Sequence, residues 1–251
     1  MEKLIHSVIL EAGDIALQFR SRLDSIQVTR KGAKDLVTEA DIAVEDHIRS
    51  RLSAATPEFG FLGEESPETK GKTSRWIVDP IDGTHSFIHG QYFWSISIAL
   101  ERKGEISHGA VYAPLLNELY MAGKGKGATR NDQTIKVSDT IDLASAMVGT
   151  GFACLRAELS DNNLERFCRI ALRTMDQRRF GSAALDCCLV ADGQMDAFWE
   201  QHLNLFDVAA GALIAEEAGA TVTDFAGNPG LNPEAVLITN GKVFSEMLEL
   251  M

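Results

Sequence analysis

Apolar residues are spaced three and four positions apart in two stretches near the start of the chain, residues 4–19 and residues 44–52. This spacing predicts two amphipathic helices, each with one apolar side. Thr38 and Asp41 stand at the separation of a capping box, in which the two side chains satisfy backbone N–H groups at a helix start. We therefore expect the second helix to begin next to Thr38.

Later segments mix helical spacing with the short apolar runs and the alternation that are typical of strands. The expected strands cover residues 59–62, 75–78, 95–100, 106–112, 118–122, 146–149 and 236–239, with another near Val222. The expected helices cover residues 162–174, 182–192 and 207–218, and a short helix ends the chain. This mixture predicts an α/β (α+β) fold. We expect one unit over residues 1–251, built from two lobes at about residues 1–140 and 141–251.

Composition narrows the classes of protein. Apolar residues make up 45% of the chain, and the formal net charge is −12, from 24 Lys and Arg against 36 Asp and Glu. This balance argues against nucleic acid or an anionic membrane as the main partner, and an anionic substrate would need cations between itself and the protein. No apolar stretch approaches the roughly 20 residues that span a bilayer, and no secretory signal pattern or Cys-x-x-Cys pair occurs. We expect a cytoplasmic protein.

The most informative segment is DPIDGT, residues 79–84, which follows a predicted buried strand. Within it, Pro80 fixes the backbone φ angle and Gly83 permits positive φ. Acids at the carboxyl end of a strand lie where ligand sites of α/β proteins form, and clustered carboxylates favour hard cations. A polar turn would be the better explanation of an isolated Asp-x-x-Asp. Glu64 after another short strand, and Asp207 at the start of an apolar helix, favour a cation site instead.

Four segments resemble conserved segments of the inositol monophosphatase family. They are residues 35–41 and 63–65, which resemble its upstream stretch and a metal-ligand segment, and residues 79–90 and 206–219, which are similar to its first and second signatures. They follow the family order and together are far more specific than any one motif. The resemblance implies a layered αβαβα sandwich of the inositol monophosphatase/fructose-1,6-bisphosphatase type, and a homodimer.

The resemblance also implies a magnesium site with two or three Mg²⁺ ions. Glu64, Asp79 and the Ile81 carbonyl would hold one ion. Asp79, Asp82 and Asp207 would hold a second, with Asp79 bridging, and Glu64 would reach a third through water. Such ions lower the pKa of a water that attacks phosphorus and stabilise the leaving oxygen.

Catalytic roles are implied for Asp41 and Thr84, which would hydrogen-bond the attacking water and help to remove its proton. Main-chain N–H groups of Gly83 and Thr84, with Asp82 beside them, would contact the substrate phosphate if a helix begins there. The capping box alone would also explain Asp41. A simple helix cap is an alternative for Thr84, but its position next to Asp82 and Gly83 favours the catalytic role.

Substrate contacts are implied for a second group of residues. Gly181, Ser182 and Ala183 resemble a turn that faces the substrate, and Glu200 stands where the family has an acid that contacts inositol hydroxyls. A helix cap is an equally good explanation of Ser182. Arg178 and Arg179 would form either a phosphate clamp or an ordinary surface pair.

Some positions depart from the family pattern. His85-Ser86 replaces the usual Thr-Asn, and Phe206 replaces a Trp before the final aspartate. Neither change removes an expected metal ligand, but both would alter the shape of the pocket. Lys31 and Lys34 are further candidates, at the entrance of the site.

The expected activity is Mg²⁺-dependent hydrolysis of a phosphate monoester, with lithium inhibition, and myo-inositol 1-phosphate is the favoured substrate among small phosphorylated polyols and sugars. Fructose 1,6-bisphosphate, histidinol phosphate and adenosine 3′,5′-bisphosphate are alternatives from related branches, because a fold does not determine the leaving group. An alternative from another class is a phosphate-binding regulator without catalysis. A serine hydrolase is not indicated, because the sequence contains no Gly-x-Ser-x-Gly motif for the nucleophile elbow.

Overall fold

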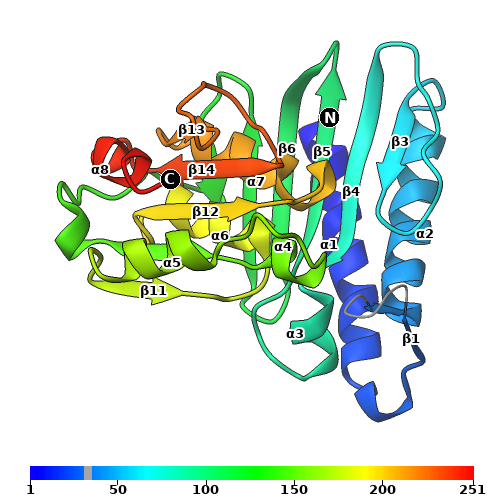
Figure 1. Ribbon diagram of the computed structural model, residues 1–251. Coiled ribbons are helices and arrows are strands. Elements are labelled where there is room, and N and C mark those ends of the chain that lie inside the picture. The colour runs from blue at the N-terminus through cyan, green and yellow to red at the C-terminus, as the bar shows by residue number, and fades with distance from the viewer. Residues whose placement is uncertain (31–35) are drawn as a thin grey trace.

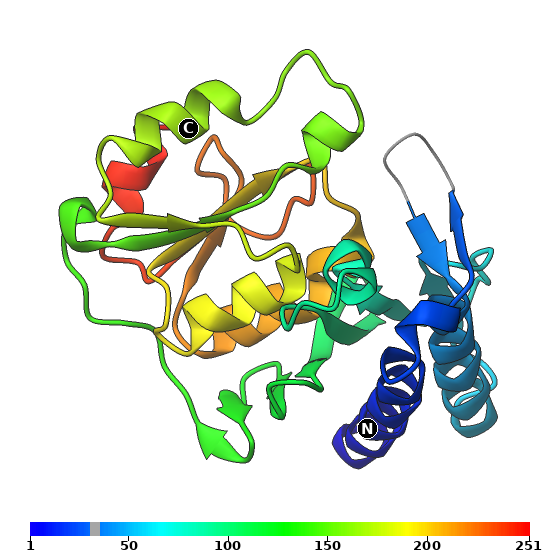
Figure 2. The same ribbon diagram turned by 90° about the horizontal axis from the view of Figure 1, so that it is seen from below.

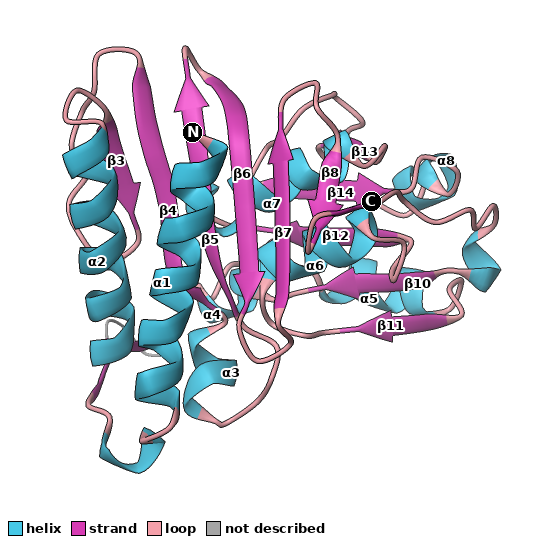
Figure 3. Cartoon of the chain, turned by 180° about the vertical axis from the view of Figure 1, so that it is seen from behind, coloured by secondary structure: helices cyan, strands magenta, loops and turns pink. Residues whose placement is uncertain are grey.

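Two long helices near the amino terminus lie side by side on one face of a large sheet (Figures 1 and 3). The structure is a computed structural model that describes residues 1–30 and 36–251. The helices are α1 (Glu2–Arg20) and α2 (Glu39–Ala55), and α2 begins after Thr38 in the predicted capping box. A 3₁₀ turn (Leu23–Ser25) and the paired strands β1 (Val28–Arg30) and β2 (Leu36–Thr38) lie between them.

The large sheet has seven strands that follow one another in chain order, β3 to β9. Strands β3 and β4 are parallel, and every later neighbouring pair is antiparallel. The strands are β3 (Gly60–Gly63), β4 (Ser74–Asp82), β5 (Ser95–Arg102), β6 (Glu105–Ala113), β7 (Glu118–Gly123), β8 (Ala128–Arg130) and β9 (Gln133–Thr134).

A second sheet of five strands has the order β11-β10-β12-β14-β13. Its strands are β10 (Met147–Thr150), β11 (Asp176–Arg178), β12 (Ala197–Gln201), β13 (Thr221–Thr223) and β14 (Ala235–Thr239). Helices α6 (Ala183–Ala191) and α7 (Leu205–Glu217) lie between the two sheets, and α5 (Leu164–Ala171) and α8 (Phe244–Leu248) cover the outer face of the second sheet (Figure 2). The layers therefore run α, β, α, β, α, which confirms the expected sandwich.

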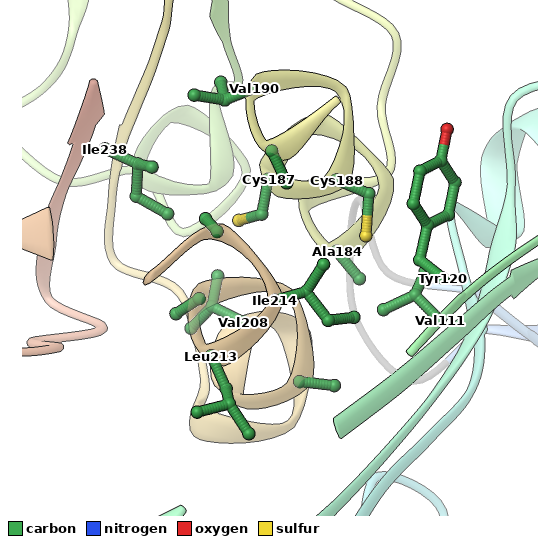
Figure 4. Packing of buried hydrophobic residues seen from close by; sticks show 14 of the residues in the cluster. Val111, Tyr120, Ala184, Cys187, Cys188, Val190, Val208, Leu213, Ile214 and Ile238 are labelled. Atoms are coloured by element: carbon green, nitrogen blue, oxygen red, sulfur yellow. The ribbon is translucent and has the colours of Figure 1, made fainter. Parts of the chain in front are cut away.

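Helices α6 and α7 are apolar on nearly every side because both sheets cover them. Figure 4 shows Cys187 and Cys188 of α6 and Ile214 of α7 packed in one cluster with Val111 and Tyr120 of the large sheet. Separate clusters fill the space under α1 and α2 and the space under α5 and α8. The middle layer is thus held from both sides, and residues at its ends have fixed positions.

The main helices and most strands form where the sequence predicts them, with some differences. Strand β4 continues to Asp82, four residues beyond its expected end, and α7 begins at Leu205 rather than at Asp207. The structure also contains strands that were not expected, namely β1, β2, β8, β9, β11 and β12. The short helices α3 (Thr84–Ile88) and α4 (Ala153–Arg156) were not expected either, and a 3₁₀ turn covers Leu143–Ser145. The division into lobes at residue 140 stays a prediction. Among the described residues, no helix is both long enough and apolar enough to cross a membrane.

Candidate functional site

An irregularity in β4 brings two acids to one place. Asp79 pairs with Ser97 of β5 and Asp82 pairs with Ser95, so three steps along β4 match two steps along β5. In a regular strand, residues three apart point to opposite faces. The extra residue cancels this alternation, and Pro80, which has no N–H to give, lies in the irregular stretch. Both carboxylates therefore reach the same space at the end of the strand.

Asp207 reaches that space from the middle layer. It is the third residue of α7, and its side chain accepts a hydrogen bond from the Asn204 backbone N–H at 2.6 Å in a capping box. One carboxylate oxygen from each of Asp79, Asp82 and Asp207 can be chosen so that all three lie within 4.8 Å of one another. The structure thus joins two neighbouring acids to one that is far away in the sequence.

The electrostatics of the three acids favour a cation between them. Burial, and then the charges of Glu64, Asp82 and Asp207, hold the pKa of Asp79 well above its usual value. Burial and the neighbouring Asp207 raise the pKa of Asp82 to about 8, and burial raises the pKa of Asp207 to about 6. Carboxylates that repel one another in a buried space are the donor set that Mg²⁺ takes, so the residues present fit a hard divalent cation.

Two other expected metal ligands lie beside this group rather than within it. Glu64 follows β3 and lines the same cavity, but it is outside the closest group of three acids. The Ile81 carbonyl also faces this region and accepts a hydrogen bond from the Thr84 hydroxyl at 3.2 Å. Both residues line the same cavity as the three acids.

The chain turns sharply after Asp82 because Gly83 has a φ of +94°, a region that favours glycine. Helix α3 begins at the next residue, Thr84. The Thr84 hydroxyl lies 3.4 Å from Oδ1 of Asp41, while Oδ2 of Asp41 accepts the Thr38 backbone N–H at 2.8 Å. Asp41 therefore caps α2 and also faces Thr84, so the two explanations of this residue coexist. Burial raises the pKa of Asp41 to about 6.

The segment before α6 holds Asp82 in place. The hydroxyl of Ser182 donates to Oδ2 of Asp82 at 2.7 Å, and the backbone N–H of Ala184 donates to the same oxygen at 2.7 Å. Ser182 also accepts the backbone N–H of Leu185 as a helix cap. Gly181 lines the cavity, whereas Ala183 is buried at the start of α6 and does not.

Glu200 lies on β12, behind the cavity rather than in its lining. It is 4% exposed, and its Oε1 accepts the backbone N–H of Ala153 at 2.9 Å. Burial raises the pKa of Glu200 to about 7, although the Ala153 N–H and the charges of Arg156 and Arg179 act in the opposite direction. Its position on β12 was not predicted, because the strand itself was not.

Arg156, Arg179 and His85 bring basic side chains to the acidic cavity. Within the described part of the chain, the guanidinium groups of Arg156 and Arg179 make no hydrogen bond or ion pair, whereas the adjacent Arg178 pairs with Asp176. Arg156 belongs to no motif, so sequence reasoning missed it, and the sequence alone did not distinguish Arg179 from its neighbour. Lys31 and Lys34 lie outside the described residues.

A larger surface cavity lies elsewhere. It has a volume of about 610 Å³, is lined by Glu2, His6 and Lys126 among others, and shares no lining residue with the acidic cavity. Its acids do not converge as those of the smaller cavity do. Chemistry rather than size therefore identifies the candidate site.

Comparison with known proteins gives consistent similarities. The inositol monophosphatase family model matches residues 1–249. An inositol-1-monophosphatase of Mesorhizobium japonicum is 39% identical over 95% of this chain and 91% of its own length. A putative Nus factor SuhB of Neisseria meningitidis is 38% identical over 96% of this chain and 93% of its own length.

Solved structures show the same likeness. The extragenic suppressor protein suhB of Bartonella henselae superposes with a TM-score of 0.94 at 36% identity, covering 99% of this chain and 97% of that one. A structure of SaIMPase-II with bound inositol monophosphate has a TM-score of 0.83 at 28% identity, covering 99% of this chain and 92% of that one.

Proposed function

Because the chain belongs to the inositol monophosphatase family, we propose that it is a metal-dependent phosphatase that uses Mg²⁺ and hydrolyses myo-inositol 1-phosphate to inositol and phosphate. The observation that carries the proposal is the convergence of Asp79, Asp82 and Asp207 in a cavity that Thr84 also lines. Acids that merely follow one another along an exposed surface would not bring three carboxylate oxygens together in this way.

In this proposal the carboxylates of Asp79, Asp82, Asp207 and Glu64, with the Ile81 carbonyl, hold two or three Mg²⁺ ions. Their charge would lower the pKa of an attacking water and stabilise the leaving oxygen. Ser182 and the Ala184 N–H support this role because they keep Asp82 in one orientation and oppose the rise of its pKa.

Thr84 and Asp41 act on the water. The Thr84 hydroxyl donates to Asp41, 3.4 Å away, so its oxygen is left to accept a hydrogen bond from the water, and Asp41 takes up the proton that the water releases. Asp41, with a pKa of about 6, is ionised at neutral pH and so has an oxygen that can accept it. Gly83 supports phosphate binding by exposing the first N–H groups of α3 beside Asp82.

The leaving alcohol belongs on the side of the second sheet. We assign the recognition of its hydroxyls to Glu200 together with Gly181, Ser182 and Ala183. Support comes from Gly181, which lines the cavity, from the acidic Glu200 near Asp207, and from the related structure that holds inositol monophosphate.

Phosphate release from myo-inositol 1-phosphate tests the proposal. We expect turnover that requires Mg²⁺ and that falls by more than about 100-fold in Asp82→Asn, which loses one charge of the donor set. The matched control is Asp46→Asn, which removes an exposed acid from α2. Unchanged turnover in Asp82→Asn, with normal metal binding, would refute the role given to Asp82.

Arg156 and Arg179 favour a second candidate, hydrolysis of a substrate whose leaving group carries another phosphate. A guanidinium without a carboxylate partner at the rim of a cation site is suited to bind phosphate through two hydrogen bonds. Fructose 1,6-bisphosphate and adenosine 3′,5′-bisphosphate are the bisphosphates to compare with myo-inositol 1-phosphate and histidinol phosphate.

Arg179→Ala distinguishes the two candidates. If Arg179 binds a second phosphate, kcat/KM for the bisphosphate falls about 10- to 100-fold, the range for a lost charged hydrogen bond, and kcat/KM for the monophosphate does not. Arg178→Ala is the control, because Arg178 is already paired with Asp176. Equal losses on both kinds of substrate would show instead that Arg179 contacts the phosphate that is removed.

A homodimer in the cytoplasm completes the proposal, and light scattering during size-exclusion chromatography tests the dimer.

The name of the Neisseria relative describes a factor rather than an enzyme, which keeps a regulator without catalysis as the alternative from another class. Calorimetric binding of myo-inositol 1-phosphate with no turnover over hours would favour that alternative.

A further inference from the structure

A buried acid on α2, Glu45, holds the turn that carries Glu64. Its side chain is 2% exposed, and its Oε2 accepts the backbone N–H of Glu65 at 2.8 Å. Its other oxygen accepts the hydroxyl of Ser66. The two residues that follow Glu64 are therefore both hydrogen-bonded to one carboxylate from another element.

The residue that precedes Glu64 also lies against this carboxylate. A Cβ atom added to Gly63 would be 2.5 Å from the carboxyl carbon of Glu45, far inside van der Waals contact. Only a glycine allows the acid to approach the strand end so closely. Glu64 is thus flanked on both sides by residues that contact Glu45.

The charge of Glu45 is partly balanced. A guanidinium nitrogen of Arg49, one helical turn later, lies 3.9 Å from Oε1 of Glu45 and also donates to Ser66 and to the Pro67 carbonyl. Charge-assisted hydrogen bonds of this kind are short and directional. The arrangement fixes the path of the backbone from Gly63 to Pro67.

We propose that Glu45 is a positioning residue that sets the direction of the Glu64 side chain and thereby the affinity of the site for Mg²⁺. The proposal rests on the proposed function, because it takes Glu64 as a metal ligand. Glu45 follows Asp41 by four residues, so the two acids lie on the same side of α2. One rigid helix therefore places Asp41 beside Thr84 and Glu45 beside the Glu64 turn, and it fixes the distance between these two parts of the site.

Calorimetric titration with Mg²⁺, in the absence of substrate, tests the proposal independently of turnover. Glu45→Gln has nearly the same shape, but it loses the charge and one of the two accepting oxygens. We expect its dissociation constant for Mg²⁺ to rise about tenfold or more, as for other residues that orient a metal ligand. At saturating Mg²⁺, kcat should stay within about threefold of the starting value, since the reacting groups are intact. Asp46→Asn is the matched control, because it removes the charge of an exposed neighbour without touching the turn.

A double mutant separates positioning from general stability. If Glu45 acts through Glu64, then Glu45→Gln added to Glu64→Gln weakens Mg²⁺ binding no further, so the two effects are not additive. Additive losses, or unchanged Mg²⁺ affinity in Glu45→Gln with a lower Tm, would overturn the proposal and leave Glu45 as a structural anchor only. Wild-type protein that binds Mg²⁺ without turnover would refute the proposed function and leave this test intact.

Discussion

Single hydrogen bonds decide how readily the acids of the site ionise. Asp82 is buried next to Asp207, which raises its pKa to about 8, and the bonds from Ser182 and Ala184 oppose that rise. The serine hydroxyl favours the charged form because its hydrogen bond to an ionised carboxylate oxygen is stronger than one to a protonated carboxyl group. At this scale the site depends on the donors that hold its acids as well as on the acids themselves.

Ser182→Ala should therefore weaken Mg²⁺ binding. Loss of the hydroxyl raises the pKa of Asp82 further, so more of it is protonated at neutral pH and competes with the metal. We expect the dissociation constant at pH 7.5 to rise about tenfold and the effect to shrink as the pH increases. Calorimetry measures both quantities.

Ser97→Ala is the control for this change. Ser97 is equally buried, but its hydroxyl bonds to the Phe206 carbonyl at 3.4 Å rather than to an acid. Ser97→Ala should lower the stability of the protein without changing its affinity for Mg²⁺. A similar loss of affinity in both variants would show that packing, rather than the bond to Asp82, is responsible.

At the scale of elements, the turn from β4 into α3 places the phosphate-facing groups. Gly83 has positive φ, and an added Cβ would lie 3.0 Å from the Gly181 carbonyl oxygen on the segment before α6. Two elements from different layers therefore meet at a position where a side chain has no room. The turn cannot move without moving Gly181 as well.

Gly83→Ala should cost both stability and activity. The backbone term alone is about 1–2 kcal/mol, and the clash with Gly181 adds to it, so thermal unfolding should occur several degrees lower. Gly104→Ala is the control, because Gly104 also has positive φ, +81°, but has nothing within 4 Å of an added Cβ. Equal losses of Tm in the two variants would contradict the role of the Gly181 contact.

The sequence predicted the elements whose pattern is local. The spacing of apolar residues identified α1, α2 and strands β3 to β7 of the large sheet, and Thr38 marked the start of α2. It could not show that β4 continues past Pro80, because that depends on pairing with β5 and on an extra residue in the ladder. Strand β12 was missed because its five residues, three apolar ones followed by Glu200 and Gln201, lie between two apolar helices and show no period of their own.

Prediction of the site followed the same division. Motifs named Asp79, Asp82 and Asp207, and the structure places them together. They gave no indication of Arg156 or Glu45, because each acts through neighbours that are distant in sequence. The contact between Ser182 and Asp82 also joins residues 100 positions apart, which no local pattern reveals.

At the scale of the whole molecule, burial of several acids makes stability depend on pH and metal. The pKa values of Asp41 and Asp207 are raised to about 6, that of Glu200 to about 7 and that of Asp82 to about 8. In the unfolded chain these groups return to usual values near 4. The folded protein therefore binds more protons than the unfolded one between about pH 4 and pH 8.

Metal-free protein should accordingly lose stability as the pH rises through that window. Because the pKa values of these four acids are higher in the folded protein than in the unfolded chain, the contribution of the acids to the free energy of unfolding is fully present below pH 4 and is lost by about pH 8. Other acids, which pair with Lys or Arg, have lowered pKa values and make stability rise with pH near pH 4. The decline in stability should therefore be clearest between pH 6 and pH 8. Calorimetric Tm values after treatment with a chelator measure it.

Added Mg²⁺ should reverse the decline, because it binds the ionised carboxylates of the folded state. For a chain of this length, each kcal/mol of change in the free energy of unfolding shifts Tm by about 2–4 °C. The stabilisation by Mg²⁺ should therefore be larger at pH 8 than at pH 6. A Tm that rises with pH in the metal-free protein, or a response to Mg²⁺ that is independent of pH, would contradict this account.

The extra residue in β4 has a consequence for how this segment can diverge. Because Asp79 and Asp82 are an odd number of steps apart, they face the same way only while the ladder with β5 is interrupted between them. Side chains at the two positions between these acids are free to vary as far as packing and the proline ring allow. The number of residues between the acids is not free to vary. A gain or loss of one residue there, without a matching change in the ladder, would rotate one acid to the opposite surface of the sheet.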